Sequence, residues 1–267
     1  MGDKRTTGAG VGPDYANWVP AGMVWGLTGA TSALAVGQLA AKGLKAPAIV
    51  RLGLGIACCG TGAFALWSAM ARNRFSYQGK RQLSRAIVEG TASRVEIVDG
   101  GVCLDVGCGS GALTIAVAKR NPQARVVGID RWGKEYASFS KGLCERNARA
   151  EGVSNTSFEQ ADACALPFAD GTFDAVTSNY VYHNIAGANK QGLLRETLRT
   201  LKKGGTFAIH DIMSPVRYGD MDAFRKSLLA EGYERVELIP TDNGLFMGRG
   251  EARLMMLTGS TLLVGKK

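Results

Sequence analysis

The chain has 267 residues, of which 46% are hydrophobic, and its 32 Lys and Arg residues against 23 Asp and Glu residues give a formal charge of +9. Its six cysteines follow no metal-binding or disulfide spacing, so we predict no metal site and a reducing compartment. No arginine-rich tract interleaved with aromatic residues occurs, so we expect no nucleic acid partner.

Two apolar segments follow an N-terminal tail of residues 1–17. Neither residues 18–41 nor residues 52–71 contain a formal charge. Each segment is long enough to cross about 30 Å of hydrocarbon as a helix, and the link between them is short. We therefore predict a transmembrane helical hairpin over residues 18–71; a buried helical pair in a soluble protein is the alternative. Small residues at four-residue spacing are expected to let membrane helices approach closely, at Gly22, Gly26, Gly53 and Ala57.

A basic cluster follows the second apolar segment. Five basic residues and no acidic one occur between positions 71 and 85, namely Arg72, Arg74, Lys80, Arg81 and Arg85. The positive-inside rule places this end of the hairpin, and with it the N-terminus, in the cytoplasm. The cluster also suits anionic lipid head groups; a solvated helix face is the alternative. The sequence thus predicts a membrane protein whose remaining domain lies on the cytoplasmic side.

Helix and strand patterns alternate through residues 72–267, which we predict to be a separate domain. Short apolar runs predict strands at 102–106, 124–130, 156–162, 173–178, 206–210, 235–239 and 261–264. Amphipathic patterns predict helices at 78–89, 112–121, 134–151, 191–202 and 222–231. This order predicts an α/β fold, a doubly wound, mostly parallel seven-stranded sheet of Rossmann-like type with an antiparallel edge strand.

A glycine turn follows the first predicted strand. Asp105 is followed by Gly107, Gly109 and Gly111 at alternate positions, and a helical pattern begins at Ala112. The missing side chains let a ligand lie against backbone N–H groups at the start of that helix. The spacing differs from the Gly-x-Gly-x-x-Gly pattern of dinucleotide-binding sites.

Polar residues also fall at the ends of the other predicted strands. Asp130 ends the second strand, 23 residues after Gly107, about the distance at which an acid accepts both hydroxyls of a ribose. Asp162 ends the third strand, Asn179 follows the fourth and His210 ends the fifth. Ligands of such sheets bind at the carboxyl ends of the strands, so we expect these residues to share one site.

Four pieces of the sequence, spread over roughly residues 76–267, resemble the class I S-adenosylmethionine-dependent methyltransferases. They are the glycine turn 105–111, the strand end 126–130, the segment 160–174 and the turn 198–205, in which Lys203 replaces a proline of the family. All four occur in the family's order and spacing. The resemblance implies that the cofactor is S-adenosyl-L-methionine, whose sulfonium cation suits the carboxylates of this site better than a phosphate group would.

The resemblance implies a cofactor site made by Asp105, Gly107, Gly109, Gly111, Asp130, Asp162, Ala163 and Asn179. In the family the glycine turn holds the methionine portion and the acid at the position of Asp130 binds the ribose. The acid at Asp162 meets the adenine amino group, and the next backbone N–H, that of Ala163, meets the ring. We also expect Trp132 at the site, either on the adenine or packed under the following helix.

Two histidines are candidates for the transfer step. Methyl transfer is an in-line displacement that requires alignment, and a general base is needed where the acceptor must lose a proton. His183 and His210 both fall near the carboxyl ends of strands, so we predict that they are catalytic, as a base or by orienting the acceptor. The Asn-Pro-Pro-Tyr signature of amino-group methyltransferases is absent from residues 178–181, which disfavours nucleic acid or glutamine nitrogen as acceptor.

The predicted membrane hairpin indicates which class of methyl acceptor the protein uses. We predict a membrane-anchored methyltransferase that acts on a lipophilic small molecule or lipid, such as a quinone precursor, which concentrates at the bilayer. Methylation of a membrane-associated protein, and a membrane-tethered cofactor-binding module without turnover, remain alternatives. Apolar residues between 244 and 257 either form a lid over the acceptor or pack in the core.

Overall fold

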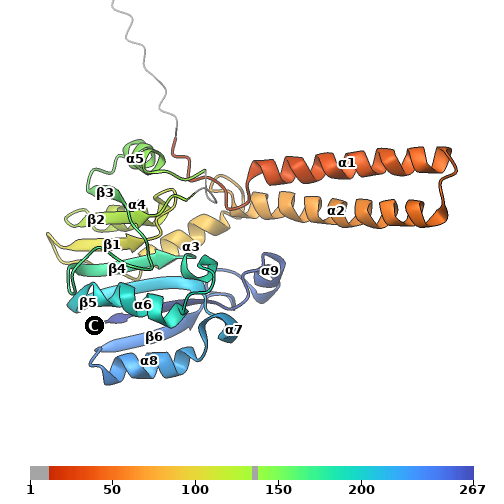
Figure 1. The fold of residues 1–267 in the computed structure, drawn as a ribbon. Coiled ribbons are helices and arrows are strands. Elements are labelled where there is room, and N and C mark those ends of the chain that lie inside the picture. Colours follow the sequence, from red (N-terminus) through yellow and green to blue (C-terminus); the bar gives the residue numbers. More distant parts are fainter. Residues whose placement is uncertain (1–11, 134–137) are drawn as a thin grey trace, which may run out of the picture. The chain divides into compact units, whose positions relative to one another are not determined.

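The chain folds into two compact units in a computed structural model, which describes residues 12–133 and 138–267 (Figure 1). One unit spans Ala16–Arg85. The other contains residues 86–267 together with the described residues that precede Ala16. Of the predicted tail over residues 1–17, residues 1–11 lie outside the described residues.

The first unit is built on a helical hairpin of α1 (Ala21–Gly43) and α2 (Ala48–Phe75) (Figure 1). Helix α2 starts before the predicted segment 52–71 and continues beyond it. Among the described residues, α2 is the one helix that is long and apolar enough to cross a membrane by length and composition. The predicted transmembrane hairpin requires two membrane-spanning helices, and one of its helices, α2, meets the criterion of length and apolar composition.

The two helices approach each other at glycines other than those predicted. A Cβ at Gly62 would lie 3.3 Å from Cγ2 of Thr31, and a Cβ at Gly55 would lie 3.4 Å from Nε2 of Gln38. In contrast, a Cβ at Gly22, Gly26 or Gly53 would meet no described atom within 4 Å. Gly55 and Gly62 are seven residues apart, about two helical turns, so they lie on one face of α2 and line its contact with α1.

The second unit contains a seven-stranded sheet in the order β3-β2-β1-β4-β5-β7-β6. The strands are β1 (Val102–Val106), β2 (Arg125–Asp130), β3 (Thr156–Gln160), β4 (Phe173–Asn179), β5 (Leu201–Ile212), β6 (Arg235–Pro240) and β7 (Ser260–Lys266). Strands β1 to β5 pair in parallel, whereas β7 is antiparallel to both β5 and β6. The antiparallel strand is thus not the predicted edge strand: β7 occupies the position between β5 and β6, and β6 forms the edge.

Helices cover both faces of the sheet (Figure 1). They are α3 (Leu83–Ala92), α4 (Ala112–Arg120), α5 (Lys141–Ala150), α6 (Lys190–Arg199), α7 (Pro215–Tyr218), α8 (Met221–Ala230) and α9 (Arg249–Leu254), with a 3-10 turn η2 (Tyr182–Asn184). Neighbouring residues of β1 point to opposite faces, as the strand period requires. Cys103 packs in the core that contains Leu113 of α4, and Leu104 packs in the core that contains Leu194 of α6 and Leu228 of α8.

Helix α5 is shorter than the predicted helix at 134–151. It begins at Lys141 because the Ser140 side chain accepts a hydrogen bond from the backbone N–H of Leu143 at 3.2 Å, which caps the helix there. Residues 134–137 lie outside the described residues. The cap fixes where the chain between β2 and α5 joins the helix.

Candidate active site

The glycine turn lies at the carboxyl end of β1, in the middle of the parallel part of the sheet. Gly107, Gly109 and Gly111 have φ values of +73°, +56° and +83°, the left-handed region that favours glycine. The backbone N–H groups of Gly107 and Cys108 both donate to the carbonyl of Ile129, at 2.8 and 2.9 Å. These bonds hold the turn against the end of β2.

Two of the three glycines also allow close packing. A Cβ at Gly107 would lie 2.2 Å from Cγ2 of Val181, and a Cβ at Gly111 would lie 3.2 Å from the Phe158 ring. At Gly109 the nearest atom, of the Phe139 ring, would be 3.6 Å away. Gly107 therefore joins the turn to the segment after β4, while a Cβ at Gly109 would be in ordinary van der Waals contact with the Phe139 ring.

Asp130 at the end of β2 is hydrogen-bonded to the turn. Its Oδ2 accepts from the N–H of Gly109 at 2.9 Å, and its Oδ1 accepts from the N–H of Trp132 at 2.8 Å. The indole N–H of Trp132 donates to the carbonyl of Gly109 at 3.0 Å. The Trp132 ring packs with Cys144 and Phe158, so of its two predicted positions the structure shows the one under α5.

Asp105 lies beneath the turn and is 1% exposed. Its Oδ2 accepts from the hydroxyl of Thr114 at 2.6 Å and its Oδ1 accepts from the hydroxyl of Thr177 at 2.9 Å. Burial raises the pKa of the Asp105 carboxyl to about 7. This differs from the predicted contact with the cofactor, because the side chain is buried and both oxygens are engaged; the geometry instead lets Asp105 hold β1, α4 and β4 together under the turn.

The pH dependence of stability provides a test of this arrangement. Burial holds the folded-state pKa of Asp105 near 7, above its ordinary value of 3.8, so folding favours the protonated form. The stability that Asp105 contributes is thus complete below about pH 4 and is lost as the pH rises through about 7. In Asp105→Asn this loss is absent, so the free energy of unfolding, measured by urea titration, should fall less than in the native chain between pH 5 and pH 8. An equal fall in the free energy of unfolding of the native chain and of Asp105→Asn would contradict the raised pKa of Asp105.

Residues of the predicted tail contact the turn. The Asn147 side chain in α5 accepts from the N–H of Asp14 at 2.8 Å and donates to the carbonyls of Asp14 at 2.8 Å and Ser110 at 2.9 Å. The Ser110 hydroxyl donates to the carbonyl of Tyr15 at 2.8 Å. Sequence reasoning missed this contact, since a two-residue segment without a pattern gives no signal of its own.

The third acidic position lies on an exposed turn after β3. Oδ1 of Asp162 accepts from the N–H of Cys164 at 2.8 Å, and this bond lowers the pKa of the Asp162 carboxyl. The N–H of Ala161 donates to the carbonyl of Asp130 at 3.1 Å, which ties the turn to the end of β2. Ala163, which lies between Asp162 and Cys164, is half-buried. The predicted adenine and ribose residues therefore belong to adjoining loops.

His210 differs from its predicted catalytic role. It is fully buried in β5, its Nδ1 bonds to Oδ1 of Asn179 at 2.9 Å and its Nε2 bonds to the hydroxyl of Thr241 at 2.8 Å. Burial lowers the pKa of His210 to about 3, so the ring is neutral. With both nitrogens bonded to protein groups, His210 has no atom left to accept a proton from a substrate. Asn179, predicted to bind the cofactor, instead supports this ring.

His183 has the geometry of a general base. It lies in η2, after β4, and its Nδ1 is 2.5 Å from Oδ1 of Asp211, a carboxylate with no exposed surface. Oδ2 of Asp211 accepts from the backbone N–H of His183 at 3.2 Å, and Oδ1 accepts from the N–H of Ile212 at 2.6 Å. Among the described residues no hydrogen-bond partner is found for Nε2 of His183, whose side chain is 14% exposed. Asp211 follows His210 at the end of β5, and nothing in the sequence pairs it with His183, 28 positions earlier.

Aromatic residues surround this pair. The Tyr180 ring centroid is 5.8 Å from that of His183 and 4.6 Å from that of His210. Tyr180 has a φ of +55°, a strained conformation for a non-glycine residue, and such strain is concentrated at functional sites. The Tyr218 hydroxyl is buried without a hydrogen-bond partner among the described residues, and burial raises its pKa. The carboxyl ends of β4 and β5 thus carry aromatic side chains beside one imidazole nitrogen that has no hydrogen-bond partner among the described residues.

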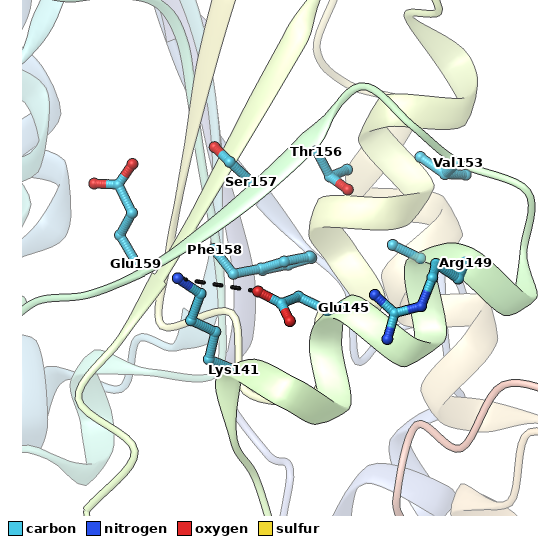
Figure 2. Close-up of a pocket in the computed structure, with 9 residues that line it drawn as sticks. Lys141, Glu145, Arg149, Val153, Thr156, Ser157, Phe158 and Glu159 are labelled. Carbon is cyan, nitrogen blue, oxygen red and sulfur yellow. Dashed lines mark ion pairs between the residues drawn. The ribbon is translucent and has the colours of Figure 1, made fainter.

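A separate cavity of about 380 Å³ lies between α5 and β3 (Figure 2). Charged residues of both signs line it, and Lys141 forms an ion pair with Glu145 at 3.9 Å. Phe158 also lines this cavity, and its ring is the one that approaches Gly111. The cavity has no free imidazole, so the chemistry of the residues points to the strand ends as the active site.

Comparison with known proteins agrees with this fold. The family described as a methyltransferase domain matches residues 97–237, more than half of the chain. The chain therefore belongs to this methyltransferase family. Together with the seven-stranded fold, the match makes it a member of the class I S-adenosylmethionine-dependent methyltransferases.

The curated proteins similar to this chain include demethylmenaquinone methyltransferases. The chain is 38% identical over 112 residues to a demethylmenaquinone methyltransferase of Thermus thermophilus, a match that covers 42% of this chain and 47% of that protein. It is 30% identical over 173 residues to one of Geobacillus stearothermophilus, covering 59% of this chain and 69% of that protein. The chain thus spans about half of the first relative's length.

A solved geranyl diphosphate methyltransferase in complex with GPP and sinefungin has a similar fold, with a TM-score of 0.53 and 14% identity. The match covers 71% of this chain and 80% of that chain. At this identity the likeness establishes the fold alone.

Proposed function

We propose that this protein transfers a methyl group from S-adenosylmethionine to a lipophilic acceptor of the quinol type at a membrane surface. The observation that carries the proposal is the His183–Asp211 pair beside the glycine turn. Val181, which packs on Gly107, lies two residues before His183. The turn and the free imidazole nitrogen are therefore neighbours, as a donor site and an acceptor site must be.

The residues around the turn fit the cofactor. The three left-handed glycines form a cradle in which added side chains would strain the backbone, and a Cβ would collide with Val181 at Gly107 and crowd Phe158 at Gly111. Asp130 and Asp162 supply carboxylates on the adjoining loops that would bind the ribose and the adenine amino group, and the backbone N–H of Ala163 would bind the ring. When bound, S-adenosylmethionine supplies the electrophilic methyl group. Asp105 acts on the site through its contacts with the two threonines, as a positioning residue.

His183 accepts the proton that the acceptor must lose. Asp211 fixes the imidazole with a proton on Nδ1, so Nε2 carries the free lone pair and points away from the carboxylate. Removal of a hydroxyl proton from a quinol makes the adjacent ring carbon a stronger nucleophile toward a methyl group. The reduced, quinol form of demethylmenaquinone, the compound named for the similar proteins, belongs to this chemical class, whereas the quinone itself has no hydroxyl proton to lose.

The hairpin is the proposed membrane anchor. Seven large apolar residues on its two helices are each more than half exposed, namely Trp25, Val36, Leu39, Ile49, Leu52, Ile56 and Leu66. Exposed apolar surface on two sides of a helical pair is unfavourable in water and favourable in lipid. The unit of residues 16–85 has eight Lys and Arg residues and no Asp or Glu, so it also suits anionic head groups. The basic cluster of residues 72–85 favours a cytoplasmic position for the catalytic unit.

Transfer of a labelled methyl group tests this function. The full chain is incubated with labelled S-adenosylmethionine and either the lipid extract or the protein fraction of bacterial membranes. We expect label in the lipid extract. Label in the protein fraction alone would favour a protein acceptor, and cofactor binding without label in either fraction would favour a binding module without turnover. An alkaline carbonate wash tests the anchor separately, because an inserted hairpin resists it and a peripheral one is released.

A further inference from the structure

The catalytic unit has its own concentration of exposed apolar residues. Six large apolar side chains are exposed among the described residues of this unit, and four of them lie in two short segments. Val216 of α7 is 98% exposed, Met256 after α9 is 64% exposed, and Leu245 and Leu254 are 44% and 41% exposed. We call α7 together with residues 245–256 the acceptor rim. Such a cluster on a soluble surface is unfavourable unless something covers it.

The two segments of the acceptor rim meet at the active edge of the sheet. The N–H of Met213, just before α7, donates to the carbonyl of Gly259, just after α9, at 3.0 Å. Arg217 donates to the carbonyl of His183 at 3.2 Å, and the Tyr180 hydroxyl lies 2.7 Å from that of Ser260. The rim therefore lies next to the strand ends that carry His183 and Tyr180.

The exposed charges of the rim are basic. Arg217, Arg249 and Arg253 are exposed, whereas Glu251, the one acidic residue of the two segments, is half-buried. In α9 the neighbouring Ala252 and Met255 pack inward, which leaves apolar and arginine side chains on the outer face. Exposed apolar side chains interleaved with arginines are typical of surfaces that lie in the head-group region of a bilayer.

We propose that the acceptor rim docks on an anionic lipid surface, so that a lipophilic acceptor reaches His183 directly from the bilayer. The arginines meet the phosphates of the lipid while Val216 and Met256 enter the acyl boundary. The choice of lipid as the partner rests on the proposed function. The contact is distinct from the hairpin anchor, because it is made by the catalytic unit beside the strand ends that carry His183.

A fluorescent probe at the rim tests the contact in the full chain. Cys59 and Cys164, the two exposed cysteines, are replaced by serine, and Val216→Cys is labelled with an environment-sensitive fluorophore. The control is Val98→Cys, which is 67% exposed and lies before β1 at the amino end of the sheet. With vesicles of phosphatidylcholine and phosphatidylglycerol in equal amounts, we expect the emission at position 216 to rise several-fold and to be quenched by nitroxide lipids. Emission at position 98 should not change.

Other outcomes would overturn the proposal. An unchanged signal at position 216, or equal signals at positions 216 and 98, would exclude lipid contact by the rim. A rise without vesicles that depends on protein concentration would instead assign the surface to a second copy of the chain. Replacing Arg249 and Arg253 by glutamine should weaken the signal on anionic vesicles, whereas an undiminished signal would exclude the charge contact.

Kinetics separate this inference from the proposed function. Because burial of one valine-sized side chain corresponds to about a tenfold change in affinity, loss of two such side chains in Val216→Ser with Met256→Ser should raise KM for a vesicle-borne acceptor by about a hundredfold. The KM for a short-chain, water-soluble acceptor and the kcat should be unchanged, and Val98→Ser should change neither. A buried probe in a chain that methylates neither acceptor would refute the proposed function and leave the rim contact in place. Methylation by a chain whose probe stays exposed to water would support the proposed function and refute the rim contact.

Discussion

Gly107→Ala is expected to weaken the binding of S-adenosylmethionine by about a hundredfold. The added Cβ would lie 2.2 Å from Cγ2 of Val181, and the φ of +73° disfavours any residue with a side chain. The left-handed conformation costs about 1–2 kcal/mol, and displacing packed atoms costs about 1–3 kcal/mol. The turn must shift to relieve both, and a hundredfold loss of affinity corresponds to about 2.8 kcal/mol. Isothermal titration calorimetry measures the effect directly.

Gly152→Ala provides the matched control. Gly152 has a φ of +69°, close to that of Gly107, but a Cβ there would meet no described atom within 4 Å. It follows α5, away from the turn, so its substitution carries a similar backbone cost without the collision. Binding should be nearly native in this variant. Native affinity in Gly107→Ala as well would mean that the turn does not hold the cofactor.

His183→Gln is expected to lower kcat by a factor of about 10² to 10⁴, the usual contribution of a positioned general base. The substitution removes the free Nε2 nitrogen, while the cofactor residues around the glycine turn are unaltered. We therefore expect unchanged affinity for S-adenosylmethionine in calorimetry and a large loss in methyl-transfer assays. Asp211→Asn should reduce the rate as well, because the amide no longer holds the imidazole with its proton on Nδ1.

Asn184→Ala is the control for the base. Asn184 is the next residue of the same turn, and its side chain donates to the carbonyl of Tyr180 at 3.2 Å on the exposed side. Its loss should leave kcat within a fewfold of the native value. If His183→Gln kept the native rate while bound cofactor was unchanged, proton removal by His183 would be excluded.

Local sequence patterns predicted the sheet because each strand carries its own signal. The runs at Val102–Val106 and Arg125–Asp130 are apolar, short and followed by turn residues, and the structure places them as neighbouring parallel strands. The place of β7 in the sheet has no such signal. Its pairing with β5 joins residues 48 to 60 positions apart along the chain, from Ile212–Ser260 to Thr206–Lys266, and strand order is decided by packing of the whole sheet.

In the site, too, some features have a local sequence signal and others depend on the tertiary fold. The glycines at 107–111 were predictable because a left-handed turn restricts the residue type. The roles of the two histidines were not, since both lie at the same sheet edge and differ in what surrounds them. His210 is bonded on both nitrogens, whereas His183 is bonded on one. Contacts formed by the tertiary fold, which a pattern of residue types does not specify, make that difference.

The central claim is methyl transfer to a lipophilic quinol, and one measurement tests it most directly. The full chain in lipid vesicles is given isotope-labelled S-adenosylmethionine and a demethylated isoprenoid naphthoquinol, and the extracted product is identified by mass spectrometry. We predict a product in which one labelled methyl group replaces a ring hydrogen, formed by the native chain and almost absent with His183→Gln. Recovery of the unmodified quinol from a chain that binds the cofactor would contradict this account.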